Sequence, residues 1–365
     1  MSIAIALSSC QTSSKSPPQD LAESRVDTQL TLNNAVLEQS NKQDNTVWKI
    51  KADNIVYSED QKTAVLDRVV GNLLQDGKII LKLRADRGEI QDNGNIVILQ
   101  DRIVASDPRN GSIMKSNLIE WRPQESLLLI KDELNAIHSN LEVNARRGKY
   151  FTNIESLEIE EDVVADSLSP TARLKSDRLV WNIPQNKIDS PGAVEIVLYD
   201  EAEKLTDKLV SDRASVDLTT TTATLNDNIE LISLQPKIQA AAQSLVWNYQ
   251  QRIGTTDRPI QILDRARQIT LTGNKGEINL ERQIAKLTAG VKGIDRQQAS
   301  QLYAEELTWM MATEQIEALG NIIYEQADPK ARLTGEKANG ILGSNNIVVT
   351  SDGKKQVTSI IDNSK

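Results

Sequence analysis

One pattern of apolar and polar positions recurs along most of this chain. Each copy centres on a small residue, and an apolar residue lies two positions before it. The third and fifth residues after the small residue complete the pattern. Apolar residues at every second position predict a β-strand with one buried face. The extra residue between the two halves predicts a bulge or sharp bend that keeps both halves facing the same way. The small residues are Ala52, Ala85, Ser116, Ala145, Ser176, Ser211, Ala242, Gly273, Ala304 and Gly335.

The copies form two alternating classes. In the odd copies the two later positions hold a large aliphatic residue and an aromatic one, such as Leu179 and Trp181. In the even copies the first of these positions is small, as at Gly88, and an aliphatic or aromatic residue usually follows, as at Ile90. Because large side chains packed against small ones fill an interior, we expect a row of Trp and Tyr to oppose a row of Gly and Ala. An apolar trough is expected where the two sheets splay apart.

Short polar segments connect the strands, for example after Tyr57 and Trp121, and this length is typical of β-hairpins. Phrases such as Leu99…Ile103 predict a third short strand before the next copy. A right-handed parallel β-helix is the alternative, but parallel strands need long crossovers. The pattern therefore favours an all-β, elongated, antiparallel open β-jellyroll, with two facing twisted sheets built from about ten repeats of ~30 residues.

Two regions differ in composition. Residues 28–361 show no composition break, so we expect one continuous array, with two modules (roughly 28–205 and 206–361) as the alternative. Residues 1–27 begin with Leu7-Ser8-Ser9-Cys10, which resembles a bacterial lipobox, and continue as a polar Ser/Pro segment typical of a flexible tether. A secretory signal also has a basic n-region and a longer apolar stretch. Neither precedes Cys10, so we expect either lipidation of Cys10 or a missing N-terminal segment.

Composition and charge argue against several functions. The net charge of −9 and the pI near 5.0 disfavour nucleic acid as a partner, because phosphate binding needs a basic face. With one Cys and one His, a metal site is not expected, and His138 is expected at the surface. The carboxylates of DRGE (86–89) and EIEED (158–162) lie on expected strands, whose neighbouring residues face opposite sides. We therefore expect no catalytic residue, no metal and no cofactor.

Two segments carry a resemblance to a known family. The first is Trp48-Lys49-Ile50-Lys51-Ala52 leading to Tyr57, and the second is the Ala-Asp-x-Gly-x-Ile phrase at 85–90. Around them, residues 30–78 resemble the periplasmic lipopolysaccharide-export proteins of the LptC type. Residues 83–107 resemble the OstA-like module that these proteins share with LptA. Familiar LptC proteins are much shorter and carry an N-terminal transmembrane helix, and no apolar run of that length occurs here.

The resemblance implies a non-enzymatic lipid carrier in the periplasm, anchored to the inner membrane. Such a protein takes the acyl chains of lipopolysaccharide from an inner-membrane ABC transporter and passes them toward the outer membrane. The implied partners are the permeases of that transporter and an LptA-type bridge protein, joined by pairing of edge strands. Exposing an acyl chain to water costs about 0.8 kcal/mol per CH₂, so the carrier has to shield the chains along its length.

The groove is expected to be lined by side chains at the two later positions of the pattern. Two other hypotheses stay open: a periplasmic structural or scaffold repeat protein that binds no lipid, and a β-helix that acts on polysaccharide. The candidate lipid-binding residues are Ile55, Tyr57, Ile90, Ile119, Trp121, Tyr150, Leu179, Trp181, Leu245, Trp247, Ile278, Leu307 and Trp309.

Overall fold

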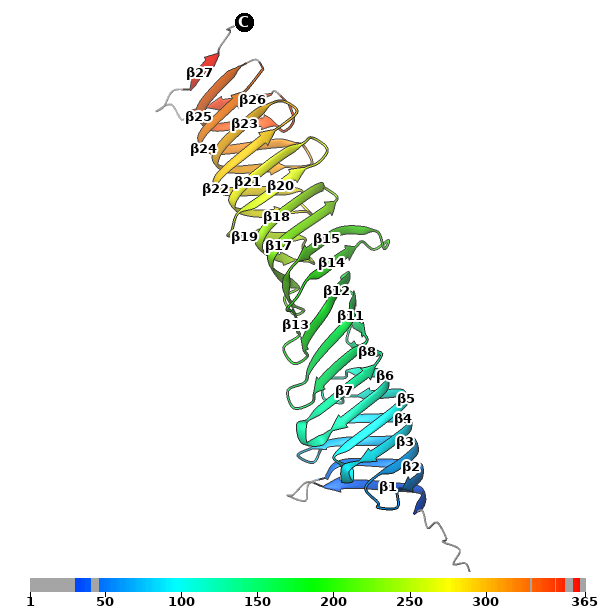
Figure 1. Ribbon diagram of the computed structural model, residues 1–365. Coiled ribbons are helices and arrows are strands. Elements are labelled where there is room, and N and C mark those ends of the chain that lie inside the picture. Colours follow the sequence, from blue (N-terminus) through cyan, green and yellow to red (C-terminus); the bar gives the residue numbers. More distant parts are fainter. Residues whose placement is uncertain (1–29, 41–45, 329, 345, 352–356, 362–365) are drawn as a thin grey trace, which may run out of the picture.

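The protein is a long antiparallel β-structure. The computed structural model describes residues 30–40, 46–328, 330–344, 346–351 and 357–361. Within them, 27 strands join into one sheet, and each strand pair is antiparallel. Figure 1 shows the strands stacked along one long axis, from β1 at one end to β27 at the other. The predicted all-β jellyroll is confirmed, and the β-helix alternative is wrong because its strands would be parallel.

The strands follow one another closely, with two short 3₁₀ turns at Asp92–Gly94 and Pro123–Glu125. Their bounds are β1 Thr31–Ser40, β2 Thr46–Tyr57, β3 Ala64–Gln75, β4 Lys78–Gln91, β5 Ile96–Ser106, β6 Ile113–Arg122, β7 Leu127–Asp132, β8 Leu134–His138, β9 Leu141–Ala145, β10 Arg147–Phe151, β11 Ser156–Leu168, β12 Thr171–Asn182, β13 Lys187–Ser190, β14 Val194–Tyr199, β15 Leu205–Ser211, β16 Arg213–Asp217, β17 Thr222–Leu234, β18 Lys237–Asn248, β19 Ile253–Thr256, β20 Ile260–Asp264, β21 Ile269–Asn279, β22 Ile284–Asp295, β23 Ser300–Met310, β24 Gln315–Gln326, β25 Ala331–Ile341, β26 Ile347–Thr350 and β27 Thr358–Ile361.

Each repeat bends where the pattern has its extra residue. In β4 the buried positions on either side of the bend are Leu83, Ala85, Gly88 and Ile90, so two runs of period two are separated by one additional residue. The register of β4 with β5 shifts at this bend, between Arg84 and Arg87. We call the part of the sheet that holds Leu83 the first layer and the part that holds Ile90 the second layer. The predicted bend is confirmed. Where the bend interrupts the hydrogen-bond ladder, one long strand becomes two short ones, such as β9 and β10.

The returning strand of each pair bends as well. β5 is continuous from Ile96 to Ser106, and Leu99 and Ile103 are both buried. The two residues Asp101 and Arg102 between them have left-handed φ angles of 62° and 47°, and the register with β4 shifts at this point. The third strand predicted from the Leu99…Ile103 phrase is therefore wrong. The wider spacing from Leu99 to Ile103 comes from a bulge, which bends β5 where the neighbouring β4 bends.

The tryptophan row lies within the second layer. On β12, Trp181 pairs with Leu157 of β11, and Leu157 pairs on its other side with Tyr150 of β10. Odd and even copies thus alternate along one layer. The predicted opposition of a Trp/Tyr row and a Gly/Ala row is wrong, because the bend sends the two later positions of every copy into the same layer.

The buried side chains of both layers form one hydrophobic cluster that runs from Trp48 to Leu342. The bends lie along one long edge of this core. The turns between strands lie along the opposite long edge, which we call the turn edge. First-layer turns there include residues 107–112 and 235–236, and second-layer turns include 152–155 and 249–252.

Cys10 and the predicted tether lie outside the described residues. The strand ladder continues across residue 205, since β15 pairs with both β14 and β17. The division into one array or two modules stays a prediction.

Candidate functional site

The predicted groove residues lie in the interior between the layers. Twelve of the thirteen are buried, and Tyr57 is partly buried and packs against the same cluster. The largest fully buried side chains of the protein include Trp121, Trp181, Trp247 and Tyr150. The interior is thus an aliphatic and aromatic core along the whole array. Contact of these residues with lipid stays a prediction.

The tryptophans differ in how their indole N–H groups are satisfied. Trp48, at the N-terminal end, donates to Gln39 Oε1 at 2.6 Å and to the Gly94 carbonyl at 3.1 Å. A buried unpaired donor costs about 1–3 kcal/mol, and few occur in a packed protein. The interior nevertheless holds four unused donors at equivalent positions, namely the indole N–H groups of Trp121, Trp181, Trp247 and Trp309.

Little free space remains between the layers. An apolar cavity of about 60 Å³ lies near the middle of the array, where Leu174 and Ile196 of the first layer meet Val216 and Trp247 of the second. A second cavity of about 50 Å³ lies toward the C-terminal end, against Leu302 and Leu342. Ordinary ligand pockets measure about 300–1,000 Å³. An acyl chain therefore requires the layers to separate, and the contacts that hold the turn edge closed become important.

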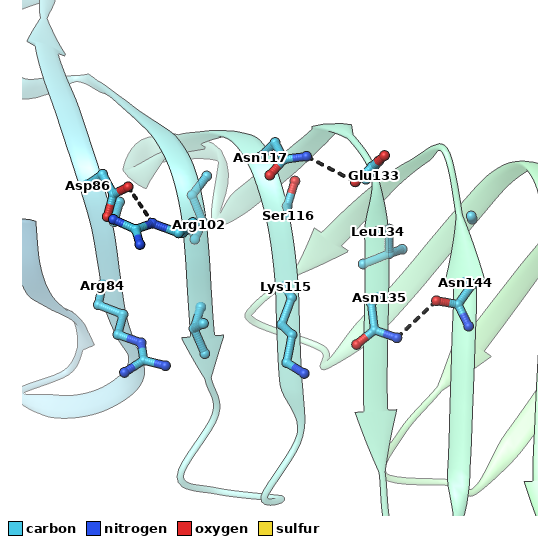
Figure 2. Close-up of a pocket in the computed structure, with 14 residues that line it drawn as sticks. Arg84, Asp86, Arg102, Lys115, Ser116, Asn117, Glu133, Leu134, Asn135 and Asn144 are labelled. Atoms are coloured by element: carbon cyan, nitrogen blue, oxygen red, sulfur yellow. Dashed lines mark hydrogen bonds and ion pairs between the residues drawn. The ribbon is translucent and has the colours of Figure 1, made fainter.

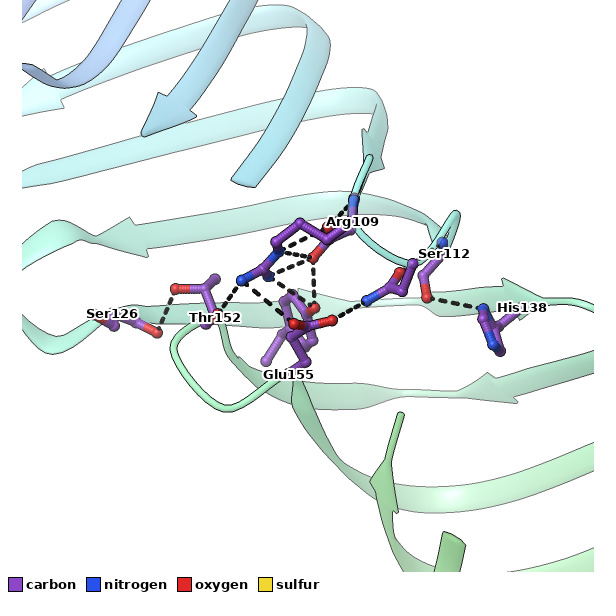
Figure 3. Close-up of polar contacts among 9 residues, drawn as sticks. Arg109, Ser112, Ser126, His138, Thr152 and Glu155 are labelled. Atoms are coloured by element: carbon purple, nitrogen blue, oxygen red, sulfur yellow. Dashed lines mark hydrogen bonds and ion pairs between the residues drawn. The ribbon is translucent and has the colours of Figure 1, made fainter. Parts of the chain in front are cut away.

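A polar network joins the layers at the turn after β5 (Figure 3). The Asp107 carboxylate is fully buried, binds Arg109 at 2.5 Å, and accepts a hydrogen bond from the Tyr150 hydroxyl at 2.8 Å. Arg109 also donates to the Thr152 carbonyl at 2.9 Å and lies 3.7 Å from Glu155. Asp107 and Arg109 belong to a first-layer turn, whereas Tyr150, Thr152 and Glu155 belong to β10 and the second-layer turn after it. This network therefore joins the two layers, and we call it the first clamp.

The electrostatics of this clamp follow from its burial. The hydrogen bond from Arg109 to Asp107 raises the pKa of the guanidinium group, which therefore stays charged. Burial raises the pKa of the Tyr150 phenol, and the negative charge of Asp107 raises it further. The phenol therefore stays protonated and continues to donate to the carboxylate.

Two further clamps occur along the turn edge. Asp207 on β15 is fully buried and accepts two bonds from Arg252, at 2.8 and 2.9 Å, and Arg252 also donates to the Gln235 carbonyl at 3.0 Å. Toward the C-terminal end, Arg267 binds Asp264 at 2.8 Å and also binds Glu314 of the other layer.

The stretch between the first two clamps lacks such a link. Within the described residues, no hydrogen bond or ion pair joins the first-layer turns at 139–140 and 169–170 to the second-layer turns at 183–186 and 218–221. The apolar cavity of about 60 Å³ lies at this stretch, which we call the window. Leu168, at the end of β11, is the most exposed large aliphatic side chain of the described chain, with 78% exposed.

His138 borders the first clamp. Its ring is half-buried, with Nδ1 at 3.4 Å from Ser112 Oγ and with an edge-on contact to Trp181 at 5.8 Å between ring centres. The expected surface position holds only in part, because one side of the ring packs against Trp181 of the second layer. No group of three or more His, Cys, Asp or Glu residues in the described part of the chain could hold a metal ion.

Apart from Tyr150, which the sequence pattern placed among the groove residues, the clamp residues were not identified from the sequence. Their signal is the strand phase: Asp107 continues the inward series Ile103, Ala105, and Asp264 continues the inward series Ile260, Ile262. A carboxylate at an inward position of a strand is rarely left unpaired. The partner arginines come from turns that look solvated when they are considered alone.

The sequence model of the family described as "Lipopolysaccharide-assembly, LptC-related" matches residues 1–128 and 193–296, which is more than half of the chain. The chain belongs to the LptC family. The resemblance seen in the sequence is thereby confirmed. A search of curated proteins found no match.

Membership in the LptC family places the protein in lipopolysaccharide transport, in which the family is a periplasmic component. Residues 129–192, between the two matched stretches, contribute Tyr150 and Thr152 to the first clamp and three of the four turns around the window. Within the described residues, no helix is long and apolar enough to span a membrane.

Proposed function

We propose that this LptC-family protein is a non-enzymatic bridge component that carries lipopolysaccharide acyl chains from an inner-membrane ABC transporter toward the outer membrane. The observation that supports this most strongly is the single hydrophobic cluster along the array. An acyl chain in water costs about 0.8 kcal/mol per CH₂, so a carrier needs an apolar path without interruption.

The clamps and the window suggest how chains enter. Among the described residues, no polar link between the facing turns opposes separation of the layers at the window. Acylated glycolipids also carry ester and amide oxygens near their acyl chains, and these oxygens accept hydrogen bonds. The unpaired indole donors of Trp181 and Trp247 suit such oxygens once a lipid occupies the interior.

Both ends of the array suit edge-to-edge assembly. Within the described residues, β1 pairs only with β2, and β26 and β27 pair only with β25. Unpaired strand edges accept a further strand. In our proposal these edges pair with strands of the transporter permeases and of an LptA-type bridge protein. Lipidation of Cys10 anchors the chain to the inner membrane.

Quenching of tryptophan fluorescence tests the proposed cargo. Lipopolysaccharide with brominated acyl chains quenches an indole that it contacts, whereas unbrominated lipopolysaccharide does not. We expect quenching of the interior tryptophans, with competition from intact lipopolysaccharide but not from its deacylated sugar. Equal fluorescence with both lipids at saturating concentrations would refute lipid carriage.

The two small cavities favour a second candidate, a scaffold repeat protein with a packed interior. In that case lipopolysaccharide leaves the fluorescence unchanged, while the strand edges still join neighbouring proteins.

A further inference from the structure

A row of alternating cationic and aliphatic side chains crosses the outer surface of the first layer. Strand register brings one residue from each of six neighbouring strands into line, from β1 to β6. Neighbouring strands lie about 4.8 Å apart, so successive cations of the row lie ~10 Å apart. In order, the residues are Val36, Lys51, Val70, Arg84, Val104 and Lys115.

This row faces away from the core. Val36 and Val70 are 47% and 60% exposed, although aliphatic side chains usually avoid water. Lys82 and Ile113 lie two residues before Arg84 and Lys115 on the same strands, and both share this outer face and are exposed. We call the four cations Lys51, Lys82, Arg84 and Lys115, with the aliphatic side chains beside them, the cationic stripe.

The four cations of the stripe have no carboxylate partner. Within the described residues, no hydrogen bond or ion pair engages their charged groups. Cations at the bend are paired instead: Arg68 binds Asp53 at 2.7 Å, and Arg102 binds Asp86 at 2.6 Å. A chain with a net charge of −9 has carboxylates in excess, so four unpaired cations on one face form a local positive field.

Part of the stripe borders a surface depression of about 910 Å³ (Figure 2). Arg84 and Lys115 line it and flank Val104 in the strand register. Figure 2 shows the side chains of Arg84 and Lys115 extending in the same direction. The Asp86–Arg102 pair lines the depression too. Arg84 and Lys115 thus leave two unpaired positive charges beside the depression, which the carboxylates of Asp86 and Glu133 also line.

We propose that the cationic stripe docks on a membrane surface that contains anionic lipids. Its cations bind lipid phosphates, and Val36, Val70 and Ile113 contact the boundary between headgroups and acyl chains. An acidic protein would match the cations, but it would not require aliphatic side chains between them. The stripe also begins on β1, the first strand after residues 1–29. This docking is independent of what the interior carries.

Vesicle binding by the full chain tests the proposal. The test variant replaces Lys51, Lys82, Arg84 and Lys115 by Gln. Near an anionic surface each cation contributes about fivefold to partitioning, so the loss of four cations should weaken binding to phosphatidylglycerol/phosphatidylethanolamine vesicles by roughly several hundredfold. Phosphatidylcholine vesicles should bind neither protein well.

A matched variant separates the stripe from net charge. It replaces Lys204, Lys237, Lys275 and Arg282 by Gln. These are exposed cations whose charged groups have no partner in the described structure. Both variants lose four positive charges, but only the stripe variant should lose vesicle binding. Val70→Glu, a change at an exposed position, should weaken binding as well. Equal losses in both quadruple variants, or wild-type binding that does not depend on phosphatidylglycerol, would overturn the proposal.

Discussion

Replacement of Tyr150 by phenylalanine tests whether the first clamp holds the two layers together. Tyr150 is fully buried, and its hydroxyl donates to the equally buried Asp107 at 2.8 Å. A hydrogen bond to a charged group contributes about 1.5–3 kcal/mol. Asp107 keeps Arg109 as a partner in the variant. We therefore expect Y150F to lower the free energy of unfolding by about 2 kcal/mol.

Urea unfolding followed by tryptophan fluorescence measures this change. Tyr57→Phe is the matched control, because the Tyr57 ring is only partly buried and its hydroxyl forms no hydrogen bond within the described residues. The control should change the free energy of unfolding by less than about 0.5 kcal/mol. If Y150F proves as stable as the control, the hydroxyl does not join the layers and the reasoning is refuted.

Alkaline pH provides a second test of the same group. Burial raises the pKa of Tyr150 in the folded protein, so the unfolded chain releases this proton first, near pH 10. The folded state then binds more protons than the unfolded state, and stability falls as pH rises above 10. The wild-type protein should lose up to about 1.4 kcal/mol more per pH unit than Y150F in this range, in urea titrations between about pH 9 and 11. Parallel losses in the two proteins would contradict the account.

The remaining predictions concern close packing and the second clamp. Gly148→Ala places a Cβ 2.8 Å from Leu134 Cδ2 and should destabilise by about 1–3 kcal/mol, whereas Gly192→Ala, with no atom within 4 Å, should be nearly neutral. Arg252→Leu leaves the buried Asp207 unpaired and should destabilise by about 3–5 kcal/mol. In urea unfolding, replacing both partners by Leu should recover most of that loss. A Gly192 variant as unstable as the Gly148 variant, or no recovery in the double variant, would disprove these assignments.

The architecture could be predicted from local chemistry. Strand period, the extra residue at the bend and the hairpin-length turns are properties of short segments, and the backbone follows them at Leu83–Ile90. The sequence pattern was less informative about the return strand. The four-residue spacing from Leu99 to Ile103 in this strand depends on two residues with left-handed φ angles, Asp101 and Arg102. The identity of these two residues does not predict that conformation.

The contacts between layers could not be predicted in the same way. The Tyr150–Asp107 and Arg252–Asp207 contacts join residues more than 40 positions apart. These contacts depend on how the bends place one layer over the other. No short sequence segment determines that arrangement. The same cause explains the Trp row: the size of each side chain was evident, but the layer in which Trp181 lies depends on the direction of the bend.

Photocrosslinking in living cells tests the central claim most directly. A photoreactive residue at Trp181 or Trp247 probes the interior, and one at Val246 probes the outer face, because Val246 is 42% exposed beside the buried Trp247. Carriage of acyl chains predicts lipopolysaccharide adducts at both tryptophan positions and none at Val246. Absence of adducts at Trp181, Trp247 and also Ile119, in a variant that still folds and accumulates, would contradict the account.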